Sequence, residues 1–129
     1  MSLIVTFYSF KGDVGRSMAS ANIGVILSQR RVKTLLVDLD LEALGLHKYF
    51  KTLKVRPSSK SGGMLDLLLV AGFERNDGEF PDWRDYVSIV NIGQGNNLSL
   101  ITSGVSYLQN MKAVRLWRSL GWNGEAVLM

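Results

Sequence analysis

The sequence has 129 residues, of which 47% are hydrophobic, and it carries a formal net charge of +4 at pH 7. This length suits one domain with a buried core, and so mild a positive charge does not by itself indicate nucleic acid or anionic lipid as a partner. The absence of cysteine excludes disulfides, thiolate metal sites and cysteine nucleophiles, and the single histidine, His47, makes a histidine metal cluster implausible.

The beginning of the chain predicts a strand, a helix and a second strand. Residues 3–8, "LIVTFY", are β-branched and aromatic and predict a strand buried on both faces. Residues 17–30 carry apolar residues at helical spacing, including Ala19 and Ile23, and Gly24 would allow this helix to pack closely on a sheet. Residues 33–37 predict a second buried strand. The three elements together predict a right-handed βαβ unit with parallel strands.

The rest of the chain alternates polar segments with short apolar ones. Residues 51–63 are basic and rich in Ser and Gly, so they predict a loop, and residues 63–72 predict a short helix. Residues 86–92 fit either a strand or a helix end, and residues 97–104 predict a strand followed by a turn. Residues 107–122 place apolar and basic residues at helical spacing, which favours a helix packed on the core over one lying on a membrane.

The segment "KGDVGRS", residues 11–17, lies between the first predicted strand and the helix. Gly12 and Gly15 would let the backbone approach an anion, and the helix would direct its free N–H groups and positive dipole end at it. Arg16 would lie against the phosphates, and the hydroxyl of Ser17 would hold Mg²⁺. The segment therefore predicts a phosphate-binding loop.

An alternative to a phosphate site is a glycine-rich turn with no ligand. The usual pattern G-x-x-x-x-G-K-[ST] is not met, because Phe10 stands at its first glycine and Arg16 at its lysine. A second motif favours the phosphate site: "LLVDLD" ends the second predicted strand with Asp38 and Asp40. The carboxyl ends of neighbouring parallel strands form one ligand-binding edge, and carboxylates suit Mg²⁺. A pair of solvated loop aspartates is the alternative.

The segment "FYSFKGDVGRSMASANIGVILSQRRVKTLLVDLDLEALGLHKYF" resembles the amino-terminal end of the ParA/MinD group of P-loop ATPases. It is most similar to the subset that reads K-G-G-V-G-R and then V-D-x-D-L-E-A-P-G-L. The resemblance is strong over residues 3–50 and continues weakly through "GGMLDLLL" and "LSLITSG". It implies an α/β fold, a mostly parallel sheet flanked by helices, as in P-loop NTPases. Residues 1–129 would then be one partial nucleotide-binding domain, incomplete at the carboxyl end.

The resemblance also implies a role for each residue that matches a family motif. Lys11 would reach across a dimer to the partner's nucleotide, and Lys11, Arg16 and Asp40 would be catalytic, with Asp40 positioning the water. The implied ligands are ATP and Mg²⁺, and the implied partner is a second copy or a related ATPase, with DNA or membrane contact as a minority expectation. The nucleotide would be bound by Lys11, Gly12, Asp13, Val14, Gly15, Arg16, Ser17 and Met18, and the metal by Ser17, Asp38 and Asp40.

The chain departs from the family pattern at several positions. Asp13 replaces a glycine, and a carboxylate 4 Å from a phosphate charge is repelled by about 1 kcal/mol or more. Arg16 keeps the charge of the usual lysine and can bind phosphate oxygens in bidentate fashion, while Ala43 replaces a proline. After residue 104 no apolar run ends in "D-[ST]", so the chain resembles an amino-terminal portion of the family domain.

Three functions are compatible with these observations. The first is a Mg-ATP-binding dimerisation switch with slow or no hydrolysis. The second is a non-catalytic relative that docks on a full-length ATPase, and the third is a basic adaptor for DNA or membrane. We expect a cytoplasmic protein, because no leader or apolar run of the ~18 residues that span a bilayer is evident. We interpret His47 as a surface or packing residue and Trp83 as a packing anchor. We interpret Arg56 as part of a solvated loop face.

Overall fold

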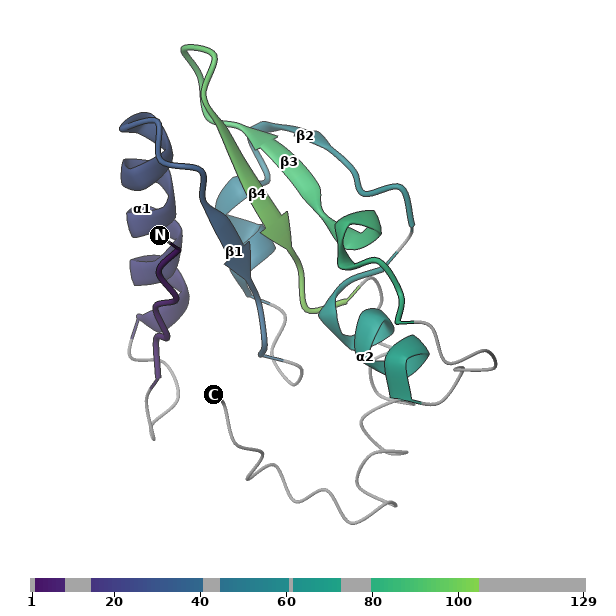
Figure 1. The fold of residues 1–129 in the computed structure, drawn as a ribbon. Coiled ribbons are helices and arrows are strands. Elements are labelled where there is room, and N and C mark those ends of the chain that lie inside the picture. The colour runs from purple at the N-terminus through teal and green to yellow at the C-terminus, as the bar shows by residue number, and fades with distance from the viewer. Residues whose placement is uncertain (1, 9–14, 41–44, 61, 73–79, 105–129) are drawn as a thin grey trace.

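The computed structural model describes residues 2–8, 15–40, 45–60, 62–72 and 80–104 (Figure 1). The helix predicted over 107–122 lies outside these residues. Helices and a sheet both form, so the predicted α/β class is confirmed. The elements in chain order are α1 (Arg16–Gln29), β1 (Leu35–Val37), η1 (Leu46–Phe50), β2 (Lys54–Arg56), α2 (Met64–Gly72), η2 (Trp83–Tyr86), β3 (Ser88–Asn91) and β4 (Asn97–Ile101).

The four strands form one sheet in the order β1-β4-β3-β2. β1 pairs with β4 in parallel, whereas β2 with β3 and β3 with β4 are antiparallel. The expectation of a mostly parallel sheet is therefore wrong for the described strands. The reason is the short connection between β3 and β4, in which the N–H of Ile92 donates to the carbonyl of Asn96 at 3.1 Å. So tight a hairpin can join only antiparallel strands.

Helix α1 confirms the helix predicted over residues 17–30, but it buries a different face. The buried residues are Ala21, Gly24 and Ser28, whereas the predicted apolar stripe leaves Ile23 and Ile26 exposed. Small residues face the sheet because the two elements approach closely. A methyl group added at Gly24 would lie 2.9 Å from Cδ1 of Leu36 on β1, which confirms that Gly24 permits close packing.

The core lies between α1, η1 and one face of the sheet. Three side chains of this core come from the two central strands: Val90 on β3, and Leu98 and Leu100 on β4. α1 and η1 cover them with Ala21, Leu46 and Phe50. This packing fixes the start of α1 relative to the ends of β1 and β4.

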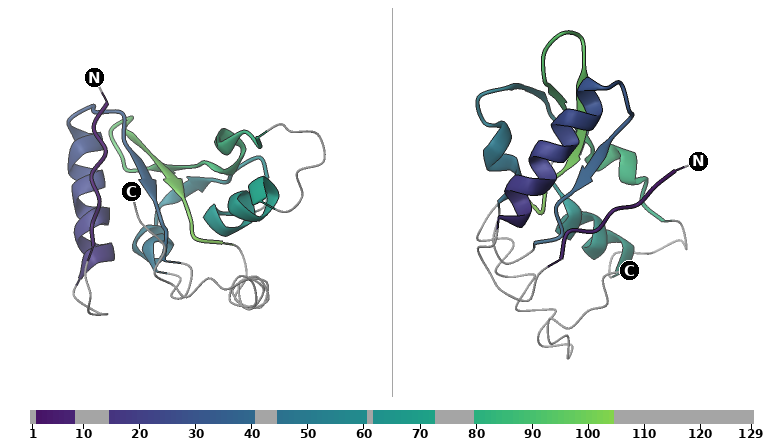
Figure 2. Two further views of the ribbon diagram at one scale, coloured as in Figure 1. Left: turned by 60° about the horizontal axis from the view of Figure 1, so that its bottom comes forward. Right: turned by 90° about the vertical axis from the view of Figure 1, so that its left-hand side faces the viewer.

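The strand predicted for residues 3–8 is wrong in this structure. Residues 2–8 form no strand and lie outside the sheet, and the side chains of Leu3 and Ile4 are 80% and 88% exposed (Figure 2). The predicted βαβ unit with this strand is consequently also wrong, since the described parallel partner of β1 is β4. The β-branched and aromatic residues of this segment have a high propensity for strands, which describes how well their side chains fit a pleated surface. This propensity does not ensure that a neighbouring strand is present for the segment to pair with.

The remaining predictions have mixed outcomes. β1 is a strand as predicted, but Leu35 and Val37 are exposed, so the strand is not buried on both faces. The loop predicted over 51–63 is wrong in part, because β2 forms within it and Val55 pairs with Val90 of β3. α2, β3 and β4 confirm the predicted helix, the strand alternative for 86–92 and the later strand. None of the helices in the described part of the chain is long and apolar enough to cross a membrane.

Candidate phosphate-binding edge

The two sequence motifs meet at one edge of the fold. Figure 1 shows that α1 begins at the edge where β1 and β4 end. Asp38 follows β1 directly, and its N–H donates to the carbonyl of Ile101 at 2.9 Å, which extends the parallel pairing to the end of β4. Ser17 is the second residue of α1. The structure therefore brings Arg16, Ser17 and Asp38 to the same edge of the sheet.

The first turn of α1 has the backbone geometry of an anion-binding helix start. Gly15 precedes the helix with φ 77° and ψ 16°, a left-handed conformation that favours glycine. Among the described residues, no side chain caps this helix and its first turn contains no acidic residue. The first N–H groups of a helix have no partner within the helix, so here they can bind an anion. Met18, in the same turn, is exposed.

Asp38 is the one acidic residue that is buried among the described residues. It is only 6% exposed, and its two oxygens accept hydrogen bonds from the N–H groups of Asp40 and Leu46, both at 3.1 Å. Burial raises the pKa of Asp38 above its ordinary value, the negative charge of Asp40 raises it further, and the backbone hydrogen bonds oppose this shift. A bound cation would stabilise this buried charge.

The donor set at this edge fits Mg²⁺. Two carboxylates and a hydroxyl, those of Asp38, Asp40 and Ser17, come from the motifs at the end of β1 and the start of α1. Within the described ranges, no three His, Asp or Glu side chains gather to form a metal site by themselves. Mg²⁺ usually retains several waters and is bound by one or two carboxylates and by phosphate, so it does not need such a cluster.

Four predicted site residues lie outside the described residues: Lys11, Gly12, Asp13 and Val14. Their assignments stay predictions. Ala43, which departs from the family pattern, also lies outside.

Sequence reasoning missed one neighbour of this edge, Ser103, and interpreted another, His47, as a surface or packing residue. Ser103, two residues beyond β4, is completely buried, and its Oγ has no hydrogen-bond partner in the described part of the chain. His47 lies in η1, where burial and then the charges of Lys48 and Lys51 lower its pKa, and Asp38 opposes this shift. Nothing local in the sequence marks Ser103 or predicts the surroundings of His47, because both acquire their neighbours through the packing of η1 and β4.

A helix start and a buried carboxylate at the carboxyl edge of an α/β sheet form the arrangement in which α/β proteins commonly bind phosphate groups. The chain belongs to the CobQ/CobB/MinD/ParA nucleotide-binding domain family, CbiA, whose model matches residues 5–120. No curated protein and no solved structure gives a significant match. The family match confirms the resemblance to the amino-terminal portion of ParA/MinD-type P-loop ATPases, and it identifies a nucleotide-binding protein of that type.

Proposed function

We propose that the protein binds Mg-ATP and acts as a dimerisation switch of the ParA/MinD type, with weak ATPase activity. The observation that carries this proposal is the family match over residues 5–120, which includes both motifs of the phosphate-binding edge. The position of Arg16 and Ser17 at the start of α1 and of Asp38 at the end of β1 supports it. In this proposal the protein works in the cytoplasm as a homodimer or with a related ATPase.

Each residue of the edge has a proposed role that fits the chemistry of its side chain or backbone. The N–H groups of the first turn of α1 and the guanidinium of Arg16 bind the phosphate oxygens. Ser17 and Asp38 hold the metal and its waters, and Asp40 orients the attacking water. Mg²⁺, when bound, neutralises phosphate charge. Lys11 completes the site of the partner subunit.

Slow hydrolysis follows from the residue that departs most from the family pattern. Asp13 places a negative charge in the loop that is proposed to surround the phosphates. This charge repels the triphosphate by about 1 kcal/mol or more at 4 Å, so binding and turnover both become weaker than with glycine. Mg²⁺ would offset part of the repulsion because it neutralises phosphate charge.

Calorimetric titration with Mg-ATP tests binding, after circular dichroism has shown that each variant is folded. We expect micromolar affinity for the wild type and about 10-fold or greater weakening in Arg16→Ala, because a hydrogen bond to a charged group contributes about 1.5–3 kcal/mol. Arg30→Ala is the matched control, since Arg30 caps the opposite end of the same helix. A folded wild type that binds no Mg-ATP contradicts the proposal, and so does equal weakening in both variants.

Analytical ultracentrifugation with and without Mg-ATP tests the switch. We expect ATP to shift the wild type from monomer to dimer. Lys11→Ala should still bind ATP but lose the shift, because Lys11 is proposed to act on the partner's nucleotide. A sedimentation coefficient that ATP does not change would contradict the dimerisation switch while leaving nucleotide binding intact.

The exposure of residues 2–8 favours a second candidate, a non-catalytic module that docks on a full-length ATPase. The segment before the phosphate loop carries Leu3, Ile4 and Val5 in exposed positions and pairs with none of the described strands. A segment left exposed in this way offers an apolar surface for docking on another protein. Asp13→Gly distinguishes the two candidates: an ATP affinity that appears only in this variant supports the docking module, and binding by the wild type contradicts it.

A further inference from the structure

A cavity lies on the face of the sheet that α1 does not cover. Leu36, Val90 and Leu98 pack on the α1 side, so their neighbours along the strands point to the opposite face. The strand register aligns three of these neighbours with Arg56 of β2 in one row across the whole sheet: Leu35 beside Ser99, Ser99 beside Ile89, and Ile89 beside Arg56. An open cavity of about 520 Å³ has this row as its floor. Its volume is within the ~300–1,000 Å³ of small-molecule sites.

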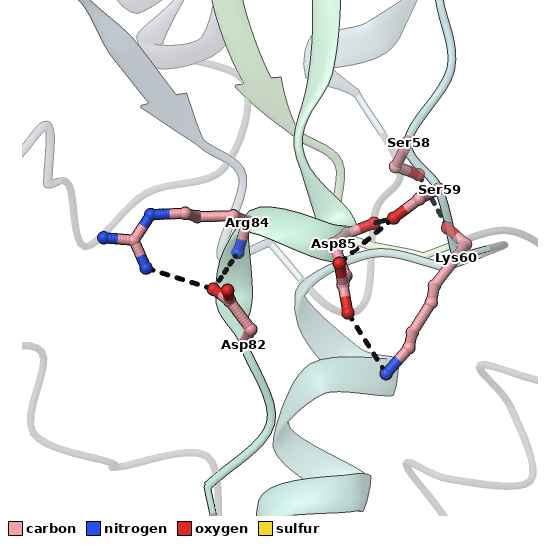
Figure 3. Close-up of polar contacts among 6 residues, drawn as sticks. All are labelled: Ser58, Ser59, Lys60, Asp82, Arg84 and Asp85. Carbon is pink, nitrogen blue, oxygen red and sulfur yellow. Dashed lines mark hydrogen bonds and ion pairs between the residues drawn. The ribbon is translucent and has the colours of Figure 1, made fainter.

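Hydrogen bonds fix one wall of the cavity before any ligand arrives. The wall segment around Ser59 is bound to η2, because Ser59 Oγ donates to the carbonyl and to Oδ1 of Asp85, both at 3.2 Å (Figure 3). Lys60 adds a backbone hydrogen bond of 3.0 Å to the Asp85 carbonyl and an ion pair of 3.3 Å to its Oδ2. A wall that is already ordered reduces the entropy lost when a ligand binds.

Another part of the lining is an exposed tryptophan of η2, held beside an arginine. Trp83 is 43% exposed, and the guanidinium of Arg84 lies 4.8 Å from the centre of its ring. Asp82 fixes Arg84 by accepting hydrogen bonds from its backbone N–H at 3.0 Å and its Nη1 at 3.2 Å (Figure 3). Trp83 is thus a surface residue that offers its ring to the cavity as well as packing on the protein.

The charge of the cavity is positive. Arg56 and Arg84 line it, and its lining among the described residues includes no acidic side chain. Arg84 is already paired with Asp82, whereas Arg56 has no ion pair within the described residues. Leu35 and Ile89 make the floor apolar. The cavity therefore combines an apolar and aromatic surface with one uncompensated guanidinium, which binds carboxylates in a bidentate geometry.

We propose that this cavity binds a small aromatic carboxylate. Its ring lies on Leu35 and Ile89 and against Trp83, and its carboxylate pairs with Arg56. The cavity is separate from the phosphate-binding edge, since α1 covers the other face of the sheet. The proposal goes beyond nucleotide binding and does not depend on it.

The test is a titration of the full chain with 1-naphthoate in the absence of nucleotide, followed by the indole N–H signal of Trp83 in ¹H–¹⁵N spectra. The signal is assigned by its loss in Trp83→Phe. We expect saturable shifts with a Kd of about 0.1–1 mM, the range for a ligand of this size. The proposal is overturned if the indole signal shows no saturable shift up to about 5 mM ligand. This result would also be expected if another part of the chain covered the cavity, and it would overturn the proposal in that case too.

Two variants and two ligands make the test specific. Arg56→Gln should weaken binding at least 5-fold, whereas Lys54→Gln, which removes one positive charge from the same strand but outside the cavity lining, should change it less than 2-fold. 1-Naphthalenemethanol, which lacks the charge, and octanoate, which lacks the ring, should each bind at least 3-fold more weakly than 1-naphthoate. Equal effects of the two variants, or equal binding of either analogue, would overturn the proposal.

Discussion

Asp38 and Leu46 are joined by a buried hydrogen bond in which the N–H of Leu46 donates to Oδ2 of Asp38 at 3.1 Å. Leu46 begins η1 and belongs to the core, together with Phe50 at the other end of η1. The carboxylate at the phosphate-binding edge is therefore tied directly to the packed interior. A change in its protonation should change both the stability of the protein and its response to cations.

The raised pKa of Asp38 predicts a specific dependence of stability on pH. A carboxyl whose pKa is higher in the folded than in the unfolded protein binds protons more tightly when folded. Its contribution to the free energy of unfolding is therefore largest below the unfolded value of 3.8 and declines as pH rises through the raised folded pKa. Asp38→Asn should remove this decline, which urea unfolding across pH 3–8 would measure. Identical pH profiles for the two proteins would show that Asp38 does not cause it.

The left-handed conformation of Gly15 predicts a cost for any side chain with a Cβ. Gly15→Ala should lower the free energy of unfolding by about 1–2 kcal/mol, the usual cost of this conformation. Space is not the cause, because a methyl group there would meet only Cε of Met18 at 3.8 Å. Gly15→Asn is the comparison, since Asn tolerates positive φ better, and it should destabilise less. Chemical denaturation measures both, and equal losses would argue against a backbone cause.

Because Gly63 is closely packed, changing it to alanine should destabilise the protein more than the same change at Gly72. A methyl group at Gly63 would overlap the carbonyl oxygen of Thr102, to which the N–H of Met64 donates at 2.7 Å. Because the obstacle is backbone, Gly63→Ala should lower the free energy of unfolding by about 1–3 kcal/mol. Gly72→Ala, at the end of α2 with no atom within 4 Å of the added carbon, should change it by less than about 0.5 kcal/mol. Comparable effects would contradict the docking of α2 on the end of β4.

A pair of alanine substitutions tests the position of the amino-terminal segment. Leu98 is completely buried in the core, and Leu98→Ala should cost about 2–5 kcal/mol. Ile4 is exposed and lies outside the sheet, so Ile4→Ala should lower the free energy of unfolding by less than about 0.5 kcal/mol. Thermal or urea unfolding measures both. A loss at Ile4 as large as that at Leu98 would show that residues 2–8 are packed in solution, as the strand composition predicts.

Local sequence information predicted several elements correctly. The helix at the start of the phosphate-binding edge, α2 and β4 all carry their periodicity or turn residues within their own segments. The sequence also predicted that Arg16, Ser17 and Asp38 lie at one edge of the sheet, because the first two begin a helix and the third follows a strand, while their roles in binding stay predictions. The aromatic-carboxylate cavity could not be predicted in this way. Its floor takes one residue from each of four strands, and their alignment depends on the register.

By itself, the sequence determined the α/β class, the family and which candidate residues stand in the two motifs. These properties depend on short-range spacing and on the chemistry of side chains that are close in the chain. Only the tertiary structure decided that β3 and β4 pair antiparallel, that residues 2–8 stay outside the sheet, and that Asp38 is buried against Leu46. Each of these outcomes is set by which distant segments find hydrogen-bond partners and close packing, and no local propensity contains that information.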